Sequence, residues 1–105
     1  MKIQINSDNR IDGHEDMLAT IEARIRERLS RFEKRLTRIE VHLRDVDGVR
    51  NGPKSLEARI EARPAGDRPV IVTQSDSSTE SAISGALRKM VDLLDSSFSK
   101  ADAVR

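Results

Sequence analysis

Five arginines recur at helical spacing in the first half of this chain. They are separated by four, three, four and three residues, and they are Arg24, Arg28, Arg31, Arg35 and Arg38. Because an α-helix advances by about 100° per residue, a single helix would carry these guanidinium groups within roughly 80° of one another. Arginine donates bidentate hydrogen bonds to phosphate and sheds water more readily than lysine. The spacing therefore predicts a polyanion-binding stripe along one helix.

The positive charge of the chain is concentrated in this segment. The whole chain has a net charge of +1, from 19 basic and 18 acidic residues. Residues 24–38 hold seven basic and two acidic residues, or +5, so the other ninety hold twelve and sixteen, or −4. The local field decides where a polyanion can bind. Five phosphate contacts would make log K fall with log salt with a slope of roughly −4 to −5.

The alternative to a binding stripe is a solvated helix face held by local ion pairs. Glu27 can pair with Arg31, and Glu22 with Arg26, each worth about a few tenths of a kcal/mol. Glu15, Glu22 and Glu33 gather on the opposite flank of the apolar stripe, so these acids are segregated from the arginines and the stripe as a whole is not neutralised. With two Phe, no Trp and no Tyr, base stacking is disfavoured. Recognition of RNA would therefore depend on phosphate contacts and shape.

No other constellation in the sequence supports catalysis or a metal site. The only histidines, His14 and His42, fall on different expected elements and lack a third ligand. Residues 45–52 faintly resemble a calcium loop, but Leu56 stands where its final acidic ligand should be. The serines between 75 and 99 form no nucleophile elbow. We expect no enzymatic activity, no catalytic residue, no metal, no cofactor and no small-molecule substrate.

Hydrophobic periodicity predicts an α+β domain of the order β-α-β-β-β-α. Strands are expected where apolar and polar residues alternate or β-branched residues cluster, at 2–6, 39–44, 56–63 and 70–73. Three of these strands have one polar and one apolar face, so both helices should cover the same face of one sheet. The first two strands would be parallel if they are neighbours, and the other pairs antiparallel. This is a two-layer sandwich with a four-stranded sheet.

Both helices are predicted from capping signals and apolar stripes. The first should begin near Gly13, behind a capping box of Asp12 and Glu15, and its stripe continues to Leu36. The second should begin at a capping box of Ser77 with Glu80. Its apolar stripe comprises Ile83, Leu87, Met90, Leu94 and Phe98. Residues 1–98 are expected to form a single domain, and residues 99–105 a frayed C-terminal tail.

Several short runs carry a family resemblance. They are RLSRF at 28–32, Leu36 with IEVHL at 39–43, IQIN at 3–6, and ESAISGALRK at 80–89 with Leu94. These runs resemble the family of ribosome hibernation promoting factors and ribosome-associated inhibitors, also described as sigma-54 modulation protein-like or S30EA proteins. The likeness is to a short form with a divergent second helix. It covers nearly the whole chain through soft patterns.

The resemblance implies a fold like that of double-stranded RNA-binding domains. Proteins of this family bind the small ribosomal subunit between its head and body, overlap the messenger and transfer RNA positions, and stop translation under stress. Both of their helices face 16S rRNA. The residues that match this pattern here are Arg28, Arg31, Arg35, Arg88 and Lys89. Arg24 and Arg38 come from the arginine spacing alone.

We therefore expect a ribosome-associated translation inhibitor whose partners are the small subunit and 16S rRNA. With no cysteine, no signal-like start and no apolar run near the roughly 20 residues that span a bilayer, a cytoplasmic location without membrane contact is expected. The alternative is a regulatory protein-binding domain, because Asp92 and Asp95 leave the second helix nearly neutral. An exposed edge strand could add a second copy, which leaves a homodimer open.

Overall fold

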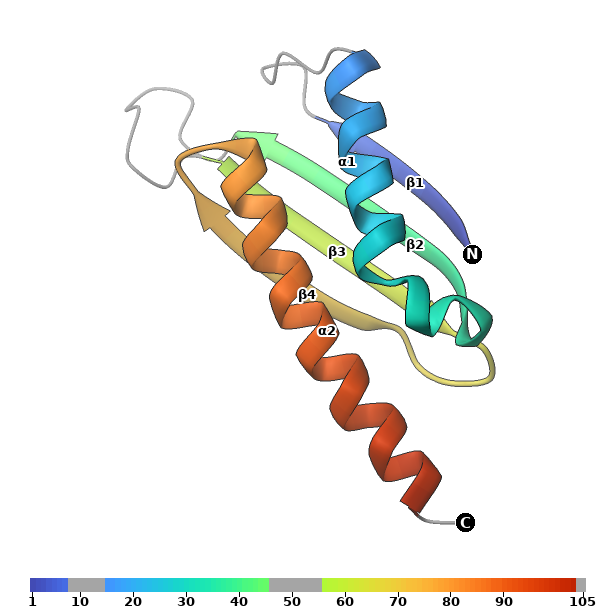
Figure 1. The fold of residues 1–105 in the computed structure, drawn as a ribbon. Helices are drawn as coiled ribbons and strands as arrows, with labels where there is room; N and C mark the ends of the chain where they lie inside the picture. The colour runs from blue at the N-terminus through green and yellow to red at the C-terminus, as the bar shows by residue number, and fades with distance from the viewer. Residues whose placement is uncertain (8–14, 46–55, 104–105) are drawn as a thin grey trace.

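In the computed structural model, two helices cover one face of a four-stranded sheet (Figure 1). The structure describes residues 1–7, 15–45 and 56–103. The elements are β1 (Lys2–Ser7), α1 (Glu15–Arg28), the 3₁₀ helix η1 (Ser30–Arg35), β2 (Leu36–Asp45), β3 (Leu56–Pro64), β4 (Val70–Asp76) and α2 (Thr79–Ala103). None of the described helices is long and apolar enough to cross a membrane.

The strands lie in the sheet in the order of the sequence, β1-β2-β3-β4. β1 pairs with β2 in parallel, with Ile3 opposite Ile39, and the two remaining pairs are antiparallel. Val41, Ile60 and Val72 form one row across the three later strands. The α+β class, the order of the elements and these strand directions agree with the sequence prediction and are confirmed.

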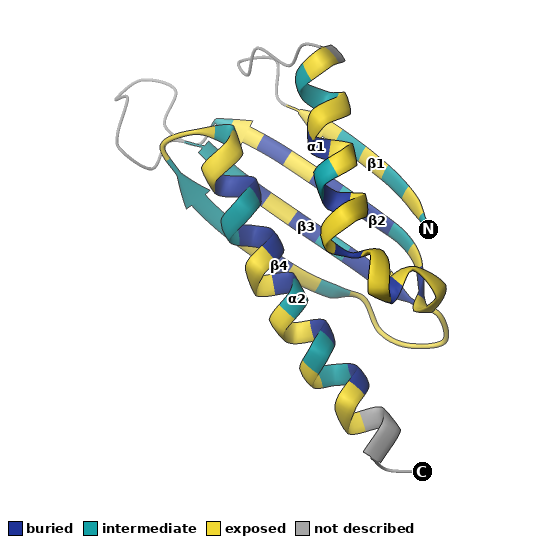
Figure 2. Cartoon of the chain, in the orientation of Figure 1, coloured by how far each residue is buried: buried dark blue, intermediate teal, exposed yellow. Residues whose placement is uncertain are grey.

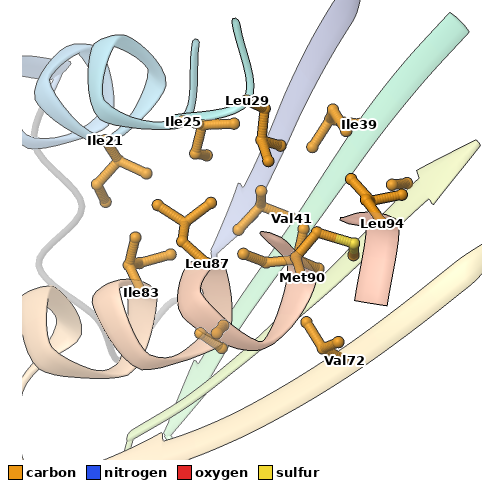
Figure 3. Packing of buried hydrophobic residues seen from close by; sticks show 14 of the residues in the cluster. Ile21, Ile25, Leu29, Ile39, Val41, Val72, Ile83, Leu87, Met90 and Leu94 are labelled. Carbon is orange, nitrogen blue, oxygen red and sulfur yellow. The ribbon is translucent and has the colours of Figure 1, made fainter. Parts of the chain in front are cut away.

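The core lies between the sheet and the two helices. Every second residue is buried from Ile39 to Leu43 in β2 and from Ala58 to Pro64 in β3, as the alternating colours of these strands show in Figure 2. The whole predicted stripe of α2 is buried as well, and its Leu87 and Met90 pack beside Val41 of the sheet (Figure 3). Burying a side chain of this size is worth about 1.5–3 kcal/mol relative to leaving it exposed.

The first helix is shorter than the sequence predicts. α1 ends at Arg28, and Leu29 leaves helical geometry with φ −104° and ψ 11°. Two turns of 3₁₀ helix follow. The Phe32 amide donates to the Leu29 carbonyl at 3.0 Å, and Leu36 begins β2 with extended backbone. Leu29, Phe32 and Leu36 are nevertheless all buried. The predicted start near Gly13, with its capping box, lies outside the described residues.

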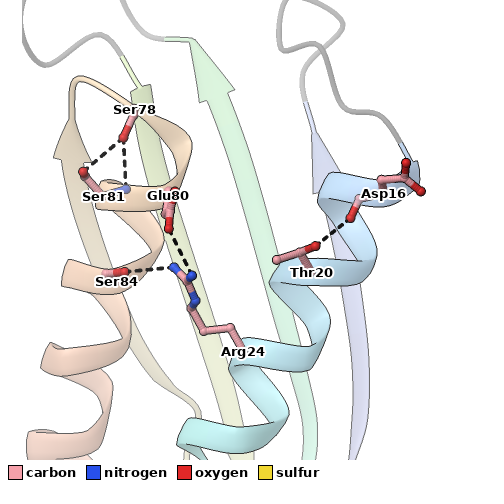
Figure 4. Close-up of polar contacts among 7 residues, drawn as sticks. All are labelled: Asp16, Thr20, Arg24, Ser78, Glu80, Ser81 and Ser84. Atoms are coloured by element: carbon pink, nitrogen blue, oxygen red, sulfur yellow. Dashed lines mark hydrogen bonds and ion pairs between the residues drawn. The ribbon is translucent and has the colours of Figure 1, made fainter.

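The N-terminal cap of α2 is Ser78, so the predicted capping box of Ser77 with Glu80 is wrong. Ser78 Oγ accepts a hydrogen bond from the Ser81 amide at 3.1 Å (Figure 4). The Ser77 amide instead donates to Asp76 Oδ1 at 2.7 Å. At its other end α2 continues to Ala103, through residues expected to form a frayed tail. A domain boundary at residue 98 stays a prediction.

Candidate nucleic-acid interface

The five arginines of the predicted stripe are divided among three elements. Arg24 and Arg28 lie on α1, Arg31 and Arg35 on η1, and Arg38 on β2. Because β2 buries Ile39, Val41 and Leu43 against the helices, Arg38 lies on the opposite face of the sheet. The prediction that a single helix carries all five is therefore wrong, and its cause is the end of α1 at Arg28.

Three of these arginines contact α2. We define the seam as the line along which α1 and η1 meet α2, and these three arginines lie on it. Arg24 donates to Glu80 Oε1 at 3.1 Å and to Ser84 Oγ at 3.3 Å (Figure 4). Further along, Arg31 donates to Asp95 Oδ2 at 2.5 Å. The Arg35 guanidinium lies 3.9 Å from the centre of the Phe98 ring. The second helix thus supplies partners for the arginines of the first.

The ion pairs of the seam are open to solvent. The Arg24 side chain is 34% exposed and that of Glu80 is 75% exposed, while Arg31 and Asp95 are 58% and 47% exposed. Exposed pairs of this kind contribute only about 0–1 kcal/mol. A phosphate can therefore replace either carboxylate at small cost. Of the two local pairs expected on the first helix, Glu22 with Arg26 is present at 3.4 Å, whereas Arg31 pairs with Asp95 instead of Glu27.

Arg28 and Arg88 are exposed cations on the two helices that form the seam. The two helices run in the same direction in Figure 1, and Arg24 contacts Ser84. One helical turn further along each helix lie Arg28 and Arg88. Both side chains are exposed, and within the described part of the chain neither makes a hydrogen bond or an ion pair. Arg28 borders an open hollow of about 620 Å³ between α1 and α2, which also includes Arg24 and Ser84. Arg88 borders a second hollow of about 600 Å³, which shares Ser84 with the first and extends toward Gln74 of β4.

Lys89 lies on the other flank of α2, next to β4. Its ammonium donates to the Thr73 carbonyl at 2.9 Å. One turn earlier, Gly85 lets α2 approach this strand closely, since a Cβ there would lie 2.8 Å from Cγ of Gln74. Of the seven residues predicted from the sequence, Lys89 and Arg38 thus lie away from the seam. The other five gather along it.

The only two aromatic side chains of the protein are packed inside it. The rings of Phe32 and Phe98 have their centroids 5.6 Å apart, and both residues are buried. The Arg31 guanidinium lies 4.7 Å from the centre of the Phe32 ring. These rings support the arginines of the seam, so they offer no platform for base stacking. Any nucleic acid at the seam would meet guanidinium and hydroxyl groups together with the exposed carboxylates of Glu80 and Asp95.

Sequence reasoning missed the role of the acids on α2. The sequence predicts Glu80 as part of a capping box and Asp95 as a charge that weakens the second helix, yet each is the ion-pair partner of a seam arginine. No local signal could reveal this, because the paired residues are 56 and 64 positions apart. Among the described residues no three His, Asp or Glu side chains are placed to hold a metal ion. His14 and the loop resembling a calcium site lie outside those residues.

A family model matches almost the whole chain. The family is described as "Sigma 54 modulation protein / S30EA ribosomal protein", and the match covers residues 3–100. The chain belongs to this family. The resemblance found in the sequence is confirmed, and the predicted ribosome-associated function and hibernation role fit the S30EA family.

Two solved structures share the fold of this S30EA-family chain. The crystal structure of the Thermus thermophilus Protein Y N-terminal domain is 22% identical, has a TM-score of 0.67, and aligns over 86% of this chain and 91% of that one. A ribosomal subunit interface protein from Coxiella burnetii is 14% identical, has a TM-score of 0.66, and aligns over 98% and 99%. A search of curated protein sequences finds no significant match.

Proposed function

We propose that this protein binds 16S rRNA on the small ribosomal subunit through the seam and inhibits translation by occupying the path of messenger and transfer RNA. Family membership supports the ribosome as partner. The observation that carries the proposal is that Arg28 on α1 and Arg88 on α2 are two exposed cations without a partner among the described residues. Each guanidinium group is therefore available to form bidentate hydrogen bonds with a phosphate.

The neighbours of this pair extend the contact along the seam. Arg24 and Arg31 stand on either side of Arg28, and their exposed ion pairs can be exchanged for phosphate contacts. Arg35 lies at the end of the row, over Phe98. Together these side chains can follow one stretch of RNA backbone. The protein needs no reacting group for this mechanism, because a bound domain excludes other ligands from the same space.

The direct test is co-sedimentation with purified 30S subunits at several salt concentrations. The variant R28E/R88E should lose most binding at low salt, because it reverses both of these exposed cations. A matched control is K34E/R68E, with the same change in net charge at two exposed residues away from that pair. The control should pellet like the wild type. The proposal fails if the wild type does not pellet with 30S subunits, or if both variants pellet equally well.

A regulatory protein-binding domain on the same fold is the second candidate. The observation that favours it is the internal pairing of Arg24 and Arg31 with Glu80 and Asp95, which lowers the net charge of the seam. A protein partner would be retained where 30S subunits are not. Homodimerisation through an edge strand also stays a prediction, and sedimentation velocity of the purified protein tests it.

A further inference from the structure

The face of the sheet opposite the helices carries a second group of cations. Because the apolar residues of β2 and β3 point to the helices, the residues between them point away. No described helix covers that side (Figure 1). On β2 and β3 it holds four arginines and three glutamates, which are Arg38, Arg44, Arg59, Arg63, Glu40, Glu57 and Glu61. Lys2 of β1 lies beside Arg38 and adds a fifth cation.

Each glutamate of this face is paired with an arginine. Glu40 forms ion pairs with both Arg38 and Arg63, at 3.4 and 3.6 Å. Arg63 also donates to Glu61 at 2.7 Å, and this hydrogen bond raises the pKa of the Arg63 guanidinium. At the far end of the strands, Arg44 pairs with Glu57 at 3.1 Å. The three carboxylates are thus neutralised within the sheet.

The glutamate and arginine side chains of this face differ in how far they are exposed to solvent. The side chains of Glu40, Glu57 and Glu61 are only 17%, 22% and 15% exposed. Those of their partners Arg38, Arg63 and Arg44 are 38%, 48% and 65% exposed. The carboxylates therefore lie against the backbone and the guanidinium groups stand over them. A ligand that approaches this face meets cations, and the five cations outnumber the three carboxylates by two.

A row of polar side chains without ion pairs crosses the middle of the same face. The register places Asn6, His42, Arg59 and Thr73 side by side on the four strands. All four are exposed, and Arg59 makes no hydrogen bond or ion pair within the described ranges 1–7, 15–45 and 56–103. From Arg38 to Arg44 the cations extend along β2 by roughly 20 Å, at about 3.3 Å per residue. This length can follow several phosphates of one strand.

We propose that this sheet face is a second polyanion-binding surface and takes an RNA backbone on the side of the domain opposite the seam. Its chemistry is phosphate binding by guanidinium groups, which form bidentate hydrogen bonds. The domain would then lie between two RNA segments, one on the seam and one on the sheet. The RNA segment at the seam rests on the proposed function. The binding of RNA to the sheet face does not depend on that function, because it is argued from the cations of the sheet alone.

The test counts RNA duplexes bound per chain, with a short RNA duplex of about one helical turn as the probe. Wild type should bind two duplexes at saturation in low salt. The variant R44Q/R59Q should bind one, and the logarithmic salt slope should become shallower by roughly 1.8, since each lost phosphate contact changes it by about 0.9. The matched control K34Q/R68Q, with the same change in net charge, should still bind two.

Two further variants separate a loss of binding from a loss of structure and from a failure of the proposed function. R59Q alone removes a cation that has no partner within the described residues, so its thermal unfolding should match that of the wild type while its duplex affinity falls. R28E/R88E should still bind one duplex, through the sheet, whether or not the protein binds 30S subunits. The inference is overturned if wild type saturates with one duplex, or if R59Q and R44Q/R59Q both bind like the control.

Discussion

Removing the acidic partners of the seam should tighten RNA binding. The variant E80Q/D95N deletes the carboxylates that pair with Arg24 and Arg31, which lie 3.1 and 2.5 Å from the two guanidinium groups. In the wild type a phosphate must displace each carboxylate before it can contact the arginine. Without the carboxylates that competition is absent, while the Ser84 hydroxyl still holds Arg24 in place.

The magnitude follows from the exposure of the pairs. Each exposed pair contributes about 0–1 kcal/mol to stability, so removing it should return at most about that much to RNA binding. Two pairs correspond to an increase in affinity of up to roughly 30-fold, because about 1.4 kcal/mol is a factor of ten. The salt slope should steepen by up to roughly 1.8 if both arginines gain a phosphate contact. The unfolding free energy should fall by no more than about 2 kcal/mol.

Fluorescence anisotropy with a labelled RNA duplex, measured at several salt concentrations, gives both quantities. The matched control is E22Q/E33Q, which also raises the net charge by two. It removes the two carboxylates that pair with Arg26. Arg26 contacts the Met1 carbonyl and therefore lies on the β1 side of α1, away from the seam. The control should change the affinity much less. Equal tightening in both variants would show that only net charge matters, and no tightening in E80Q/D95N would refute the seam as the binding site.

Three single substitutions test other contacts. F98A should destabilise the protein by about 3–5 kcal/mol in chemical denaturation, because it empties the site where Phe98 packs on Phe32; a loss below 1 kcal/mol would contradict this packing. S78A should cost about 1 kcal/mol by removing the cap of α2, and S77A, as its control, should cost less. K89Q should leave duplex binding unchanged in anisotropy, because Lys89 contacts the Thr73 carbonyl away from the seam; a large loss would place it at the interface.

The sheet and the second helix could be predicted from the sequence, whereas the end of the first helix could not. Alternation in β2 and β3 and the stripe of α2 are local patterns that burial imposes directly. The chain leaves the α-helix at Leu29. The apolar residues Leu29, Phe32 and Leu36 still follow helical spacing, because η1 and the start of β2 also direct these side chains into the core. No Gly or Pro between residues 15 and 45 marks the change.

The sequence identified most of the arginines of the candidate site, but it did not show how they are placed in the fold. Helical spacing alone identified Arg24, Arg28, Arg31 and Arg35, which do lie together along the seam. The same spacing assigned Arg38 to this group. Successive side chains of a strand point to opposite faces of the sheet, and Arg38 precedes the buried Ile39, so it lies on the face away from the helices. The cations of the sheet face were hidden for a different reason. The glutamates that alternate with these arginines offset most of their charge in a count along the sequence, and only the structure shows that Glu40 and Glu61 are much less exposed than Arg63.

Competition on the 30S subunit tests the central claim most directly. The amounts of labelled messenger RNA and initiator transfer RNA bound to 30S subunits are measured while the protein is added at low salt. If the protein acts by occupancy, both ligands should be displaced in proportion to the protein bound, and R28E/R88E should displace neither. The claim is contradicted if the protein pellets with 30S subunits while both RNAs remain bound at their original levels.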